Sequence, residues 1–432
     1  MSAKTALNAT YVLFSHKAVT PAAILQPHRD QTRSRCAQAG LVLVAHDTTE
    51  FVFSSHREGI GQLRSPHDHG FLMHASLALT ADGHRRPLGV LGAHFWTRSI
   101  EGKTKKKAKG KTGDKPIDKE LESSRWFRQV VVAEEQLGPD IPCVHVADRE
   151  ADSYDLFARL VDRSSRFVIR NRIDRVARSE DEGPTEHIRT LFERVNATIE
   201  MSVPIARREP KAVPARGTSL LPREARIARL SIKAVSIQVR KPPYLKDVPM
   251  WLDLNVVYVR EIDTPEGVES VAWTLVTTEP IDTVQDILAI IEYYRGRWPI
   301  EEFFKAIKTG CQVEKLQLET FAALKNAIAM YLVLAWRMLL IRAFARSEPD
   351  ASANVALSPS EIVVLREMQP DAKLPERPTV AQAFVAIAMM GGYIKHNIPP
   401  GWLTLARGLE KLILLERGWS AAQARGPKGR DP

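Results

Sequence analysis

The chain has 432 residues, of which 44% are hydrophobic and 26% charged, and its formal net charge is +10. These values are ordinary for a soluble globular protein of two or three domains, and the positive charge favours an anionic partner, with nucleic acid as the first candidate. The three cysteines lie far apart without a CxxC pair, which argues against disulfides and zinc and favours a reducing cytoplasm.

The sequence offers no membrane segment. Its N-terminal residues contain neither a long apolar core nor a small-residue cleavage signal. The most apolar run, AIAMYLVLAW (327–336), is followed by Arg337 and is too short to span a bilayer. We therefore expect a buried helix there and no membrane partner.

The first half of the chain predicts a sheet that begins with antiparallel strands. LVLVAHD (41–47) is a continuous apolar run that stops at an aspartate, which is typical of a strand buried on both faces. GFLMHASLALTADG (70–83) and PLGVLGAHFWTR (87–98) are also strand-like, with a turn at 81–83 between them.

A basic segment interrupts this sheet. Between Lys103 and Lys111 there are six lysines in nine residues without a periodic apolar face, which predicts a flexible loop. The loop either contacts DNA phosphates or only solubilises the chain. A helix is expected from about Glu122, and PCVHVAD (142–148) is then a second strand that ends at an aspartate.

The rest of the chain changes character twice. After a helix at 153–163 and a strand at 166–172, residues 173–280 alternate apolar and polar positions between prolines and glycines, which predicts a β-rich insertion. Helical patterns then continue to about residue 418, and the tail 419–432 is expected to be disordered.

Two aspartates end predicted strands, and such positions lie at the mouth of an α/β fold, where ligand sites form. Asp47 and Asp148 are therefore candidate site residues. The alternative is that each only caps the turn or helix that follows it.

The stretch YYRGRWPIEEFFKAIKTG (293–310) carries an ordered set of polar residues. Because seven residues drift by only about 20° around a helix, Tyr294, Glu301 and Lys308 are expected on one stripe, with Arg297 one turn before Glu301. The alternative is a surface face with i,i+4 ion pairs. Pro299 is expected to kink this helix or to start a new one.

Cleavage of a phosphodiester bond would require this combination of carboxylates and cations. Three carboxylates can hold two Mg²⁺ ions, which activate a water or a 3′-hydroxyl and stabilise the leaving oxygen. Neighbouring arginine and lysine side chains would hold the phosphates beside the scissile bond.

The spacing Y-x2-R-x3-E-x6-K, together with HDTTE (46–50) and ADREAD (147–152), resembles the DDE transposases of the insertion-sequence-four family, transposon-five type. ESSRW (122–126) and GGYIKHNIPPGWLTLARGL (391–409) add to the resemblance, which covers roughly residues 10 to 418. It implies an α/β fold in which an RNase H-like mixed-sheet catalytic core carries a β-rich insertion and an α-helical C-terminal region.

The expected domains are a partial N-terminal helical region (1–40), the two parts of the core (41–172 and 281–310), the β-rich insertion (173–280), a helical C-terminal dimerisation region (311–418) and the tail (419–432).

The same resemblance implies the site residues. Asp47, Asp148 and Glu301 would be the catalytic triad and would bind two Mg²⁺ ions, with Mn²⁺ as a possible substitute. The DNA-binding residues would be Tyr294, Arg297, Lys308, Arg170, Trp273 and Lys305, with Trp273 stacking on a base flipped from the duplex. The alternative for Trp273 is simple packing within the sheet.

The resemblance implies a cut-and-paste DNA transposase that hydrolyses transposon ends and transfers them into target DNA as a synaptic homodimer. It also implies a cytoplasmic, nucleoid-associated bacterial protein. Only 46 residues precede Asp47, fewer than the family usually has, which suggests a truncated end-recognition region. Two alternatives stay open: a non-catalytic DNA-binding or dimerising inhibitor of transposition, and a metal-dependent RNase H-like nuclease.

Overall fold

The structure is a computed structural model that describes residues 3–54, 57–63, 65, 67–98, 124–179, 183–195, 199–205, 224–394 and 399–424. The lysine-rich segment between Lys103 and Lys111, the start of the helix expected at Glu122, and residues 425–432 lie outside this description. The expectation that the disordered tail begins at residue 419 is wrong, because residues 419–424 continue the last helix. The chain divides into two compact units. The first comprises Met1–Lys109, Gln129–Pro142 and Trp298–Pro432, and the second Gly110–Arg128 and Cys143–Arg297.

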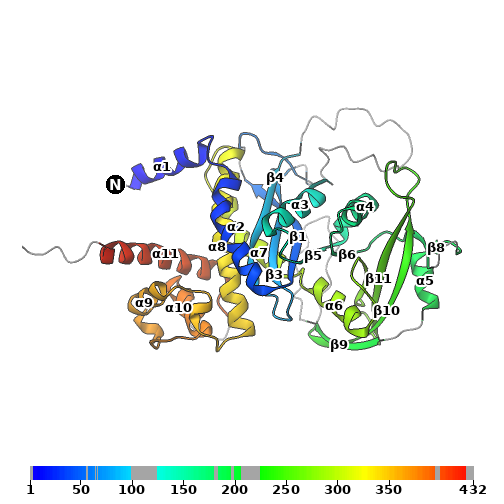
Figure 1. Cartoon of the computed structure of the whole chain (residues 1–432). Helices are drawn as coiled ribbons and strands as arrows, with labels where there is room; N and C mark the ends of the chain where they lie inside the picture. The colour runs from blue at the N-terminus through cyan, green and yellow to red at the C-terminus, as the bar shows by residue number, and fades with distance from the viewer. Residues whose placement is uncertain are drawn as a thin grey trace, which may run out of the picture. The chain divides into compact units, whose positions relative to one another are not determined.

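The first unit combines a small antiparallel sheet with a set of helices (Figure 1). Its strands are β1 (Val42–Phe53), β2 (Gly61–Gln62), β3 (His69–Thr80) and β4 (Pro87–Trp96). Its helices are α1 (Ala3–Ser15), α2 (Pro21–Ala39), α7 (Pro299–Lys305), α8 (Phe321–Ser347), α9 (Pro359–Met368), α10 (Val380–Met390) and α11 (Trp402–Ala424), together with most of α3 (Arg125–Leu137). Short helical turns lie at Val313–Lys315, Ala353–Val355 and Pro370–Ala372, and a π-helical turn at Ala306–Gly310.

The predicted antiparallel start of the sheet is confirmed, because β3 pairs with both β1 and β4. The expectation that the first strand ends at Asp47 is wrong. β1 continues to Phe53, and Asp47 lies opposite Ala75 in the middle of the ladder. The continuation has a physical cause: the β-branched and aromatic residues after Asp47 suit a pleated strand, and Phe51 packs against Phe71 on β3.

The outer edge of β4 is closed by side chains from α2 and α8. An uncovered edge would leave backbone donors and acceptors without partners and would invite pairing with another chain. Here Trp336 Nε1 donates to Pro87 O at 2.9 Å, Arg35 Nε donates to Leu88 O at 2.5 Å, and His28 Nε2 accepts from Val90 N at 3.0 Å. These bonds fix the sheet against α2 and α8.

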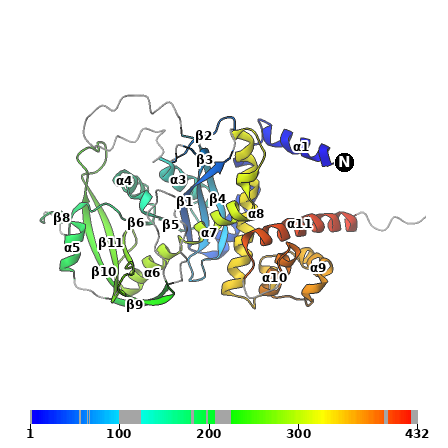
Figure 2. The ribbon, with the colours of Figure 1, turned by 180° about the vertical axis from the view of Figure 1, so that it is seen from behind.

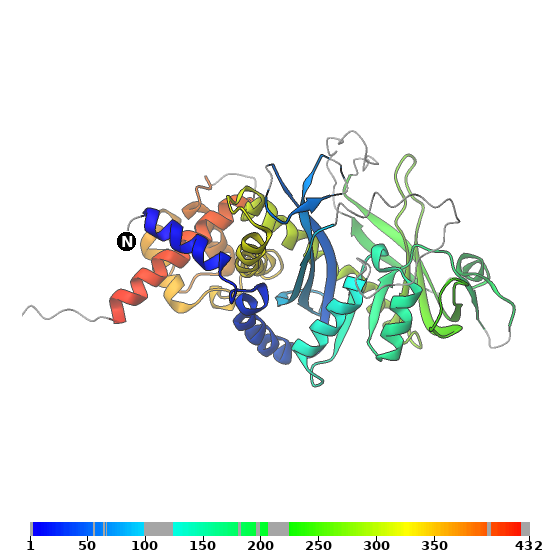
Figure 3. The same ribbon diagram turned by 90° about the horizontal axis from the view of Figure 1, so that it is seen from above.

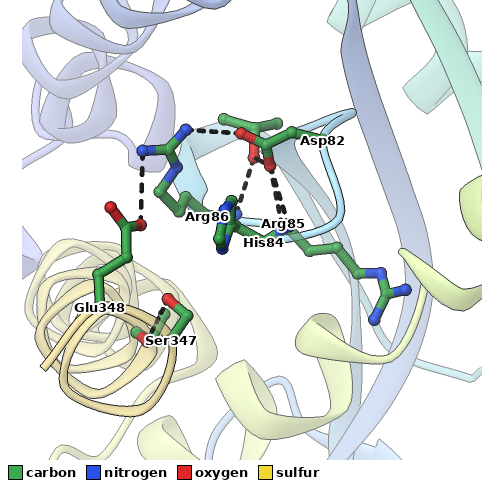
Figure 4. A network of polar contacts seen from close by, with 8 residues as sticks. Asp82, His84, Arg85, Arg86, Ser347 and Glu348 are labelled. Atoms are coloured by element: carbon green, nitrogen blue, oxygen red, sulfur yellow. Dashed lines mark hydrogen bonds and ion pairs between the residues drawn. The ribbon is translucent and has the colours of Figure 1, made fainter.

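The turn between β3 and β4 is a second attachment to α8 (Figure 4). Arg86 donates to Asp82 and also pairs with Glu348, which follows α8, at 3.5 Å. Asp82 accepts further bonds from the Thr80 hydroxyl and from the backbone N–H groups of His84 and Arg85. Burial alone would raise the pKa of Asp82, but the hydrogen bonds from Thr80 and Arg86 lower it below its ordinary value.

Helix α8 is the main apolar element of the first unit. It is longer than the apolar run at 327–336 suggested, and within the described part of the chain it alone is long and apolar enough to cross a membrane. However, 61% of its most apolar window is buried, against β4, α2, α10 and the π-helical turn. This packing confirms a buried helix and suits the core of a soluble protein. Figure 3 shows the C-terminal helices, orange to red, beside α8 in yellow.

The second unit is built on a mixed sheet (Figure 2). Its strands are β5 (Cys143–Ala147), β6 (Phe167–Arg170), β7 (Val176–Arg178), β8 (Glu186–His187), β9 (Ile199–Ile205), β10 (Arg226–Arg240), β11 (Trp251–Ile262) and β12 (Ala272–Thr277). Its helices are α4 (Tyr154–Asp162), α5 (Ile188–Arg194) and α6 (Val284–Arg295), with a short turn at Arg149–Ala151.

Strand pairing differs between the two sequence segments of the second unit, the strand–helix–strand segment before residue 173 and the alternating segment 173–280. β5 and β6 are parallel, as expected for apolar strands joined by helix α4. β12, β11, β10, β7 and β8 continue the sheet antiparallel from β6, and β9 pairs with β10. The long β10–β11 hairpin therefore accounts for the alternating pattern that predicted a β-rich segment.

Pro299 begins a new helix, which was one of the two expectations for this residue; the other was a kink within a single helix. α6 ends at Arg295, Arg297 lies between the helices, and Pro299 is the first residue of α7, where its missing N–H costs nothing. A single helical stripe is therefore wrong. Tyr294 lies on α6, Glu301 on α7 and Lys308 on the π-helical turn that follows.

Candidate active site and nucleic-acid contacts

Asp47 is a partly exposed carboxylate in an otherwise buried part of β1. Its Oδ1 accepts a hydrogen bond from the backbone N–H of Thr48 at 2.7 Å. Asp47 therefore combines a rigid strand position with an accessible anionic group.

The residues on either side of Asp47 point to the opposite face of the sheet and form a polar layer there. Thr48 Oγ1 lies 2.9 Å from His74 Nδ1, and Ser76 Oγ lies 3.1 Å from His46 Nδ1. The two histidine rings stack at 5.8 Å, and Ser76 also donates to Gln129 of α3. This layer fixes the strands on both sides of Asp47.

Asp148 follows β5 directly, as the sequence predicted. Its side chain caps the short turn Arg149–Ala151 by accepting from the Glu150 backbone N–H at 2.8 Å. The capping role is thus present, and it also fixes the carboxylate at the strand end. Asp148 itself is partly exposed.

The remainder of the ADREAD motif is structural. The Asp152 side chain is fully buried and pairs with Arg175 at 2.5 Å. It also accepts from the backbone N–H groups of Arg172 and Ile173 at 2.6 and 2.7 Å. Asp152 therefore ties the loop after Asp148 to the loop after β6. Glu150 pairs with Arg125 of the ESSRW motif at 3.4 Å, so two of the sequence motifs meet in the second unit.

Glu301 lies in the first turn of α7, a helix that packs against β1 in the first unit. A carboxylate in this position is favoured by the positive end of the helix. The adjacent Glu302 has a different environment: it forms ion pairs with Arg346 at 2.9 Å and Arg342 at 4.0 Å on α8. Glu302 is thus committed to holding two helices together, whereas Glu301 is the candidate ligand.

Lys308 lies on the π-helical turn, where a backbone bond runs from Cys311 N to Ala306 O at 2.9 Å. Such turns are rare and are frequent at functional sites. The Lys308 ammonium lies 5.6 Å from the centre of the Phe51 ring and 3.9 Å from Glu314. Burial lowers the pKa of Lys308, while Glu314 and Glu50 oppose that shift.

In the second unit, Tyr294 and Trp273 contact each other. Their rings meet edge to face at 5.4 Å, with Tyr294 buried and Trp273 partly exposed on β12. Arg297 is partly exposed, and its backbone N–H donates to Tyr294 O at 3.0 Å. Trp273 therefore packs within its unit and still presents part of its surface, and its stacking on a DNA base stays a prediction.

The other two predicted DNA-binding cations have simple surroundings. Arg170 ends β6 and donates from its guanidinium to Ala272 O at 3.2 Å. Lys305 is exposed at the end of α7. Both are accessible to an anionic ligand.

The candidate residues are distributed over the two units as follows. The first unit holds Asp47, Glu301, Lys305 and Lys308, and the second holds Asp148, Arg170, Trp273, Tyr294 and Arg297. Within the residues that the structure describes, no group of three or more histidine, cysteine, aspartate or glutamate side chains is arranged to hold a metal ion. The proposed donors are nevertheless all carboxylates, which are the ligands that hard cations such as Mg²⁺ require.

Sequence reasoning missed the ion pairs that anchor α7. Arg342 and Arg346 are two arginines at i,i+4 spacing in a mainly apolar helix, and both pair with Glu302. This spacing was an available signal, since buried or half-buried arginines need an acidic partner. Glu314, which contacts Lys308 and accepts from Val52 N at 2.9 Å, was also missed, and no local pattern marks it.

Residues 128–337 match the family model described as the transposase DDE domain. The matched segment includes Asp148, Tyr294, Arg297, Glu301 and Lys308, while Asp47 precedes it. The match supports the DDE transposase family, whose members act on DNA as nuclease or transposase enzymes, and the predicted α/β fold of RNase H-like type is confirmed.

Proposed function

We propose that the chain is a cut-and-paste DNA transposase of the insertion-sequence-four family, transposon-five type. The observation that carries the proposal is the transposase DDE domain match, which includes Asp148 and the complete set Tyr294, Arg297, Glu301 and Lys308. The reaction would be hydrolysis at the transposon ends, followed by transfer of the freed 3′-ends into target DNA.

Asp47, Asp148 and Glu301 would be the catalytic carboxylates. Their oxygen donors suit two Mg²⁺ ions, with Mn²⁺ as a substitute, and such ions would supply activation of the attacking hydroxyl and stabilisation of the leaving oxygen. The surroundings of each carboxylate support this role. Asp47 is held by a β-ladder, Asp148 by its cap, and Glu301 by a helix that Glu302 anchors.

The cations and aromatic residues would hold the DNA. Arg297, Lys308, Arg170 and Lys305 would contact phosphates, because a guanidinium or ammonium group pairs with phosphate oxygens. Partial burial of Lys308 would strengthen its attraction to a phosphate, since screening by water is reduced there. Trp273 would stack on a base, with Tyr294 as the ring that fixes it.

The partners would be the two transposon ends and the target, all double-stranded DNA, bound by a synaptic homodimer in the bacterial cytoplasm near the nucleoid. The formal net charge of +10 supports a polyanionic partner.

The test compares neighbouring glutamates in a cleavage and strand-transfer assay with Mg²⁺, using the inverted repeats that flank the gene as substrate. Glu301→Gln should abolish cleavage while DNA binding survives, because it removes one anionic ligand and preserves the size of the side chain. Glu302→Gln should leave measurable cleavage, and Glu367→Gln, an exposed residue of α9, should behave as wild type.

Two results would count against the proposal. Undiminished cleavage by Glu301→Gln would remove that residue from the triad. Cutting without any joining of the cut ends to a second DNA would indicate a nuclease and not a transposase.

A further inference from the structure

The helix that carries Glu301 is attached to α8 through its neighbour. Glu302 lies 2.9 Å from Arg346 and 4.0 Å from Arg342, and its side chain is only 19% exposed. The two arginines differ: the Arg346 side chain is 55% exposed, whereas that of Arg342 is 16% exposed. The pair with Arg346 is the closer one, but it is exposed, and an exposed pair contributes little to stability. Arg342 Nε makes no hydrogen bond to a described residue and lies 4.0 Å from Glu302, but it is buried, where removal of one partner of an ion pair costs more.

Arg342 is also in contact with the C-terminal motif. Its guanidinium lies 4.5 Å from the centre of the Trp402 ring, and its NH1 donates to Pro400 O at 3.3 Å. Both residues belong to the segment 391–409, which adds to the family resemblance of the sequence and to which the proposed catalysis gives no role. Arg342 thus connects the acidic neighbour of Glu301 with the start of α11.

The same tryptophan approaches the turn that carries Lys308. A Cβ atom added at Gly310, the last residue of the π-helical turn, would lie 3.3 Å from Trp402 O and 3.0 Å from Met338 Cε. Because Gly310 has no side chain, α11 and α8 can pack closely against that turn. The start of α11 contacts both the anchor of Glu301 and the segment of Lys308.

We propose that Arg342 is a positioning residue which, stacked on Trp402 and paired with Glu302, fixes the orientation of α7 and hence of Glu301. The proposal rests on the proposed function, because Glu301 needs a fixed direction only if it is a catalytic ligand. It gives the C-terminal motif a role in catalysis that requires no contact with DNA.

The chemistry of the guanidinium explains why arginine is needed. It is planar, so one face can lie on the Trp402 indole while its edge donates to the Pro400 carbonyl and lies within ion-pair distance of Glu302, which an ammonium cannot do. Burial and the nearby Arg346 lower the pKa of Arg342, and Glu302 only partly opposes that shift. Trp402, Glu302 and the Pro400 carbonyl all contact the same guanidinium. Removal of one of these contacts should therefore weaken the other two.

The experiment measures the single-turnover rate of end cleavage at saturating enzyme, alongside DNA affinity, in the full-length chain. Arg342→Ala and Trp402→Ala should each slow cleavage by about tenfold to a hundredfold, with unchanged DNA affinity, because a small misplacement of a catalytic group has effects of this size. Trp402→Phe should restore most of the rate, since phenylalanine keeps an aromatic face. The double variant should be no slower than the single ones.

Arg346→Ala is the matched control, because it removes the exposed partner of Glu302 on the same helix and should slow cleavage far less. Equal effects of Arg342→Ala and Arg346→Ala, or a full effect of Trp402→Phe, would overturn the proposal.

Hydrogen exchange of the α7 amides separates this proposal from the proposed function. In Arg342→Ala the amides of Glu301–Lys305 should exchange faster than in wild type, while those of β11 should not change. If wild type does not cut DNA, the proposed function fails and exchange alone decides the role of Arg342. Unchanged exchange in α7 would refute that role whatever the activity.

Discussion

At the scale of single residues, capping and catalysis do not exclude each other. The sequence posed them as alternatives for Asp47 and Asp148, and the structure gives each aspartate a bond to a backbone N–H. Such a bond restricts the rotamer of the carboxylate, which is what a metal ligand or catalytic group requires. For Asp148 the cap is therefore an argument for a well-placed carboxylate. Asp47 lies within β1 and caps no turn or helix, so the capping alternative is wrong for Asp47. The activity of both aspartates stays a prediction.

His28 leads to a prediction about pH. It is 8% exposed, and burial, together with Arg35 and Arg29, lowers its pKa from 6.5 to about 4. Between these values the unfolded chain binds the proton and the folded chain does not, so stability is complete above pH 6.5 and is lost as pH falls towards 4. At pH 5 this loss should be about 2 kcal/mol.

The measurement is the urea midpoint of wild type and His28→Gln at pH 7.5 and pH 5. Glutamine can still accept from Val90 N, but it does not titrate. The variant should therefore lose less stability on acidification than wild type. Parallel losses in the two proteins would show that His28 does not titrate in this window.

At the scale of elements, the helices and strands that depend on local sequence pattern could be predicted. β3, β4, β5, α4 and β6 lie where alternation, apolar runs and turn residues placed them. The length of β1 was missed because its second half is stabilised by pairing with β3 and not by apolar continuity. The π-helical turn was missed because it depends on packing of Gly310 against Trp402 and Met338, residues distant in sequence.

Glycine at the contact between α10 and α11 leads to a prediction about stability. A Cβ atom at Gly408 would overlap Ile387 O of α10, whereas one at Gly418, on the same helix, would meet nothing within 4 Å. Gly408→Ala should therefore destabilise the protein by about 2 kcal/mol or more, since backbone atoms must move apart. Gly418→Ala should stabilise it by up to about 1 kcal/mol, because alanine favours helix.

Both variants are checked by their thermal and urea unfolding midpoints against wild type. The opposite signs make the comparison decisive, because substitution and helix are the same in both. A Gly408→Ala protein as stable as wild type would mean that α10 and α11 do not approach closely at this point.

At the scale of the whole molecule, the site could be predicted only as a set of residues. The spacing Y-x2-R-x3-E-x6-K predicts that these side chains act together, which stays a prediction. Its expectation of one helical stripe is wrong, because the chain has α6, α7 and a π-helical turn there. The spacing of a motif along the sequence does not indicate where the backbone ends one helix and begins the next. Asp47 lies outside the matched segment, so its place in the triad depends on HDTTE alone.

Charge is the property of the whole chain that leads to the final prediction. With a formal net charge of +10, DNA affinity should fall steeply with salt, because each neutralised phosphate releases condensed counterions. Arg170, whose guanidinium lies at the end of β6, is one of the proposed phosphate contacts. Arg170→Ala should weaken binding and reduce the slope of log K against log[salt] by about 1, since one contact contributes about 0.9 for duplex DNA. Arg366→Ala, on α9 and beside Glu367, should leave the slope unchanged. Binding to the inverted-repeat DNA, measured between low and physiological salt, checks this, and an unchanged slope in Arg170→Ala would exclude that arginine from the phosphate contacts.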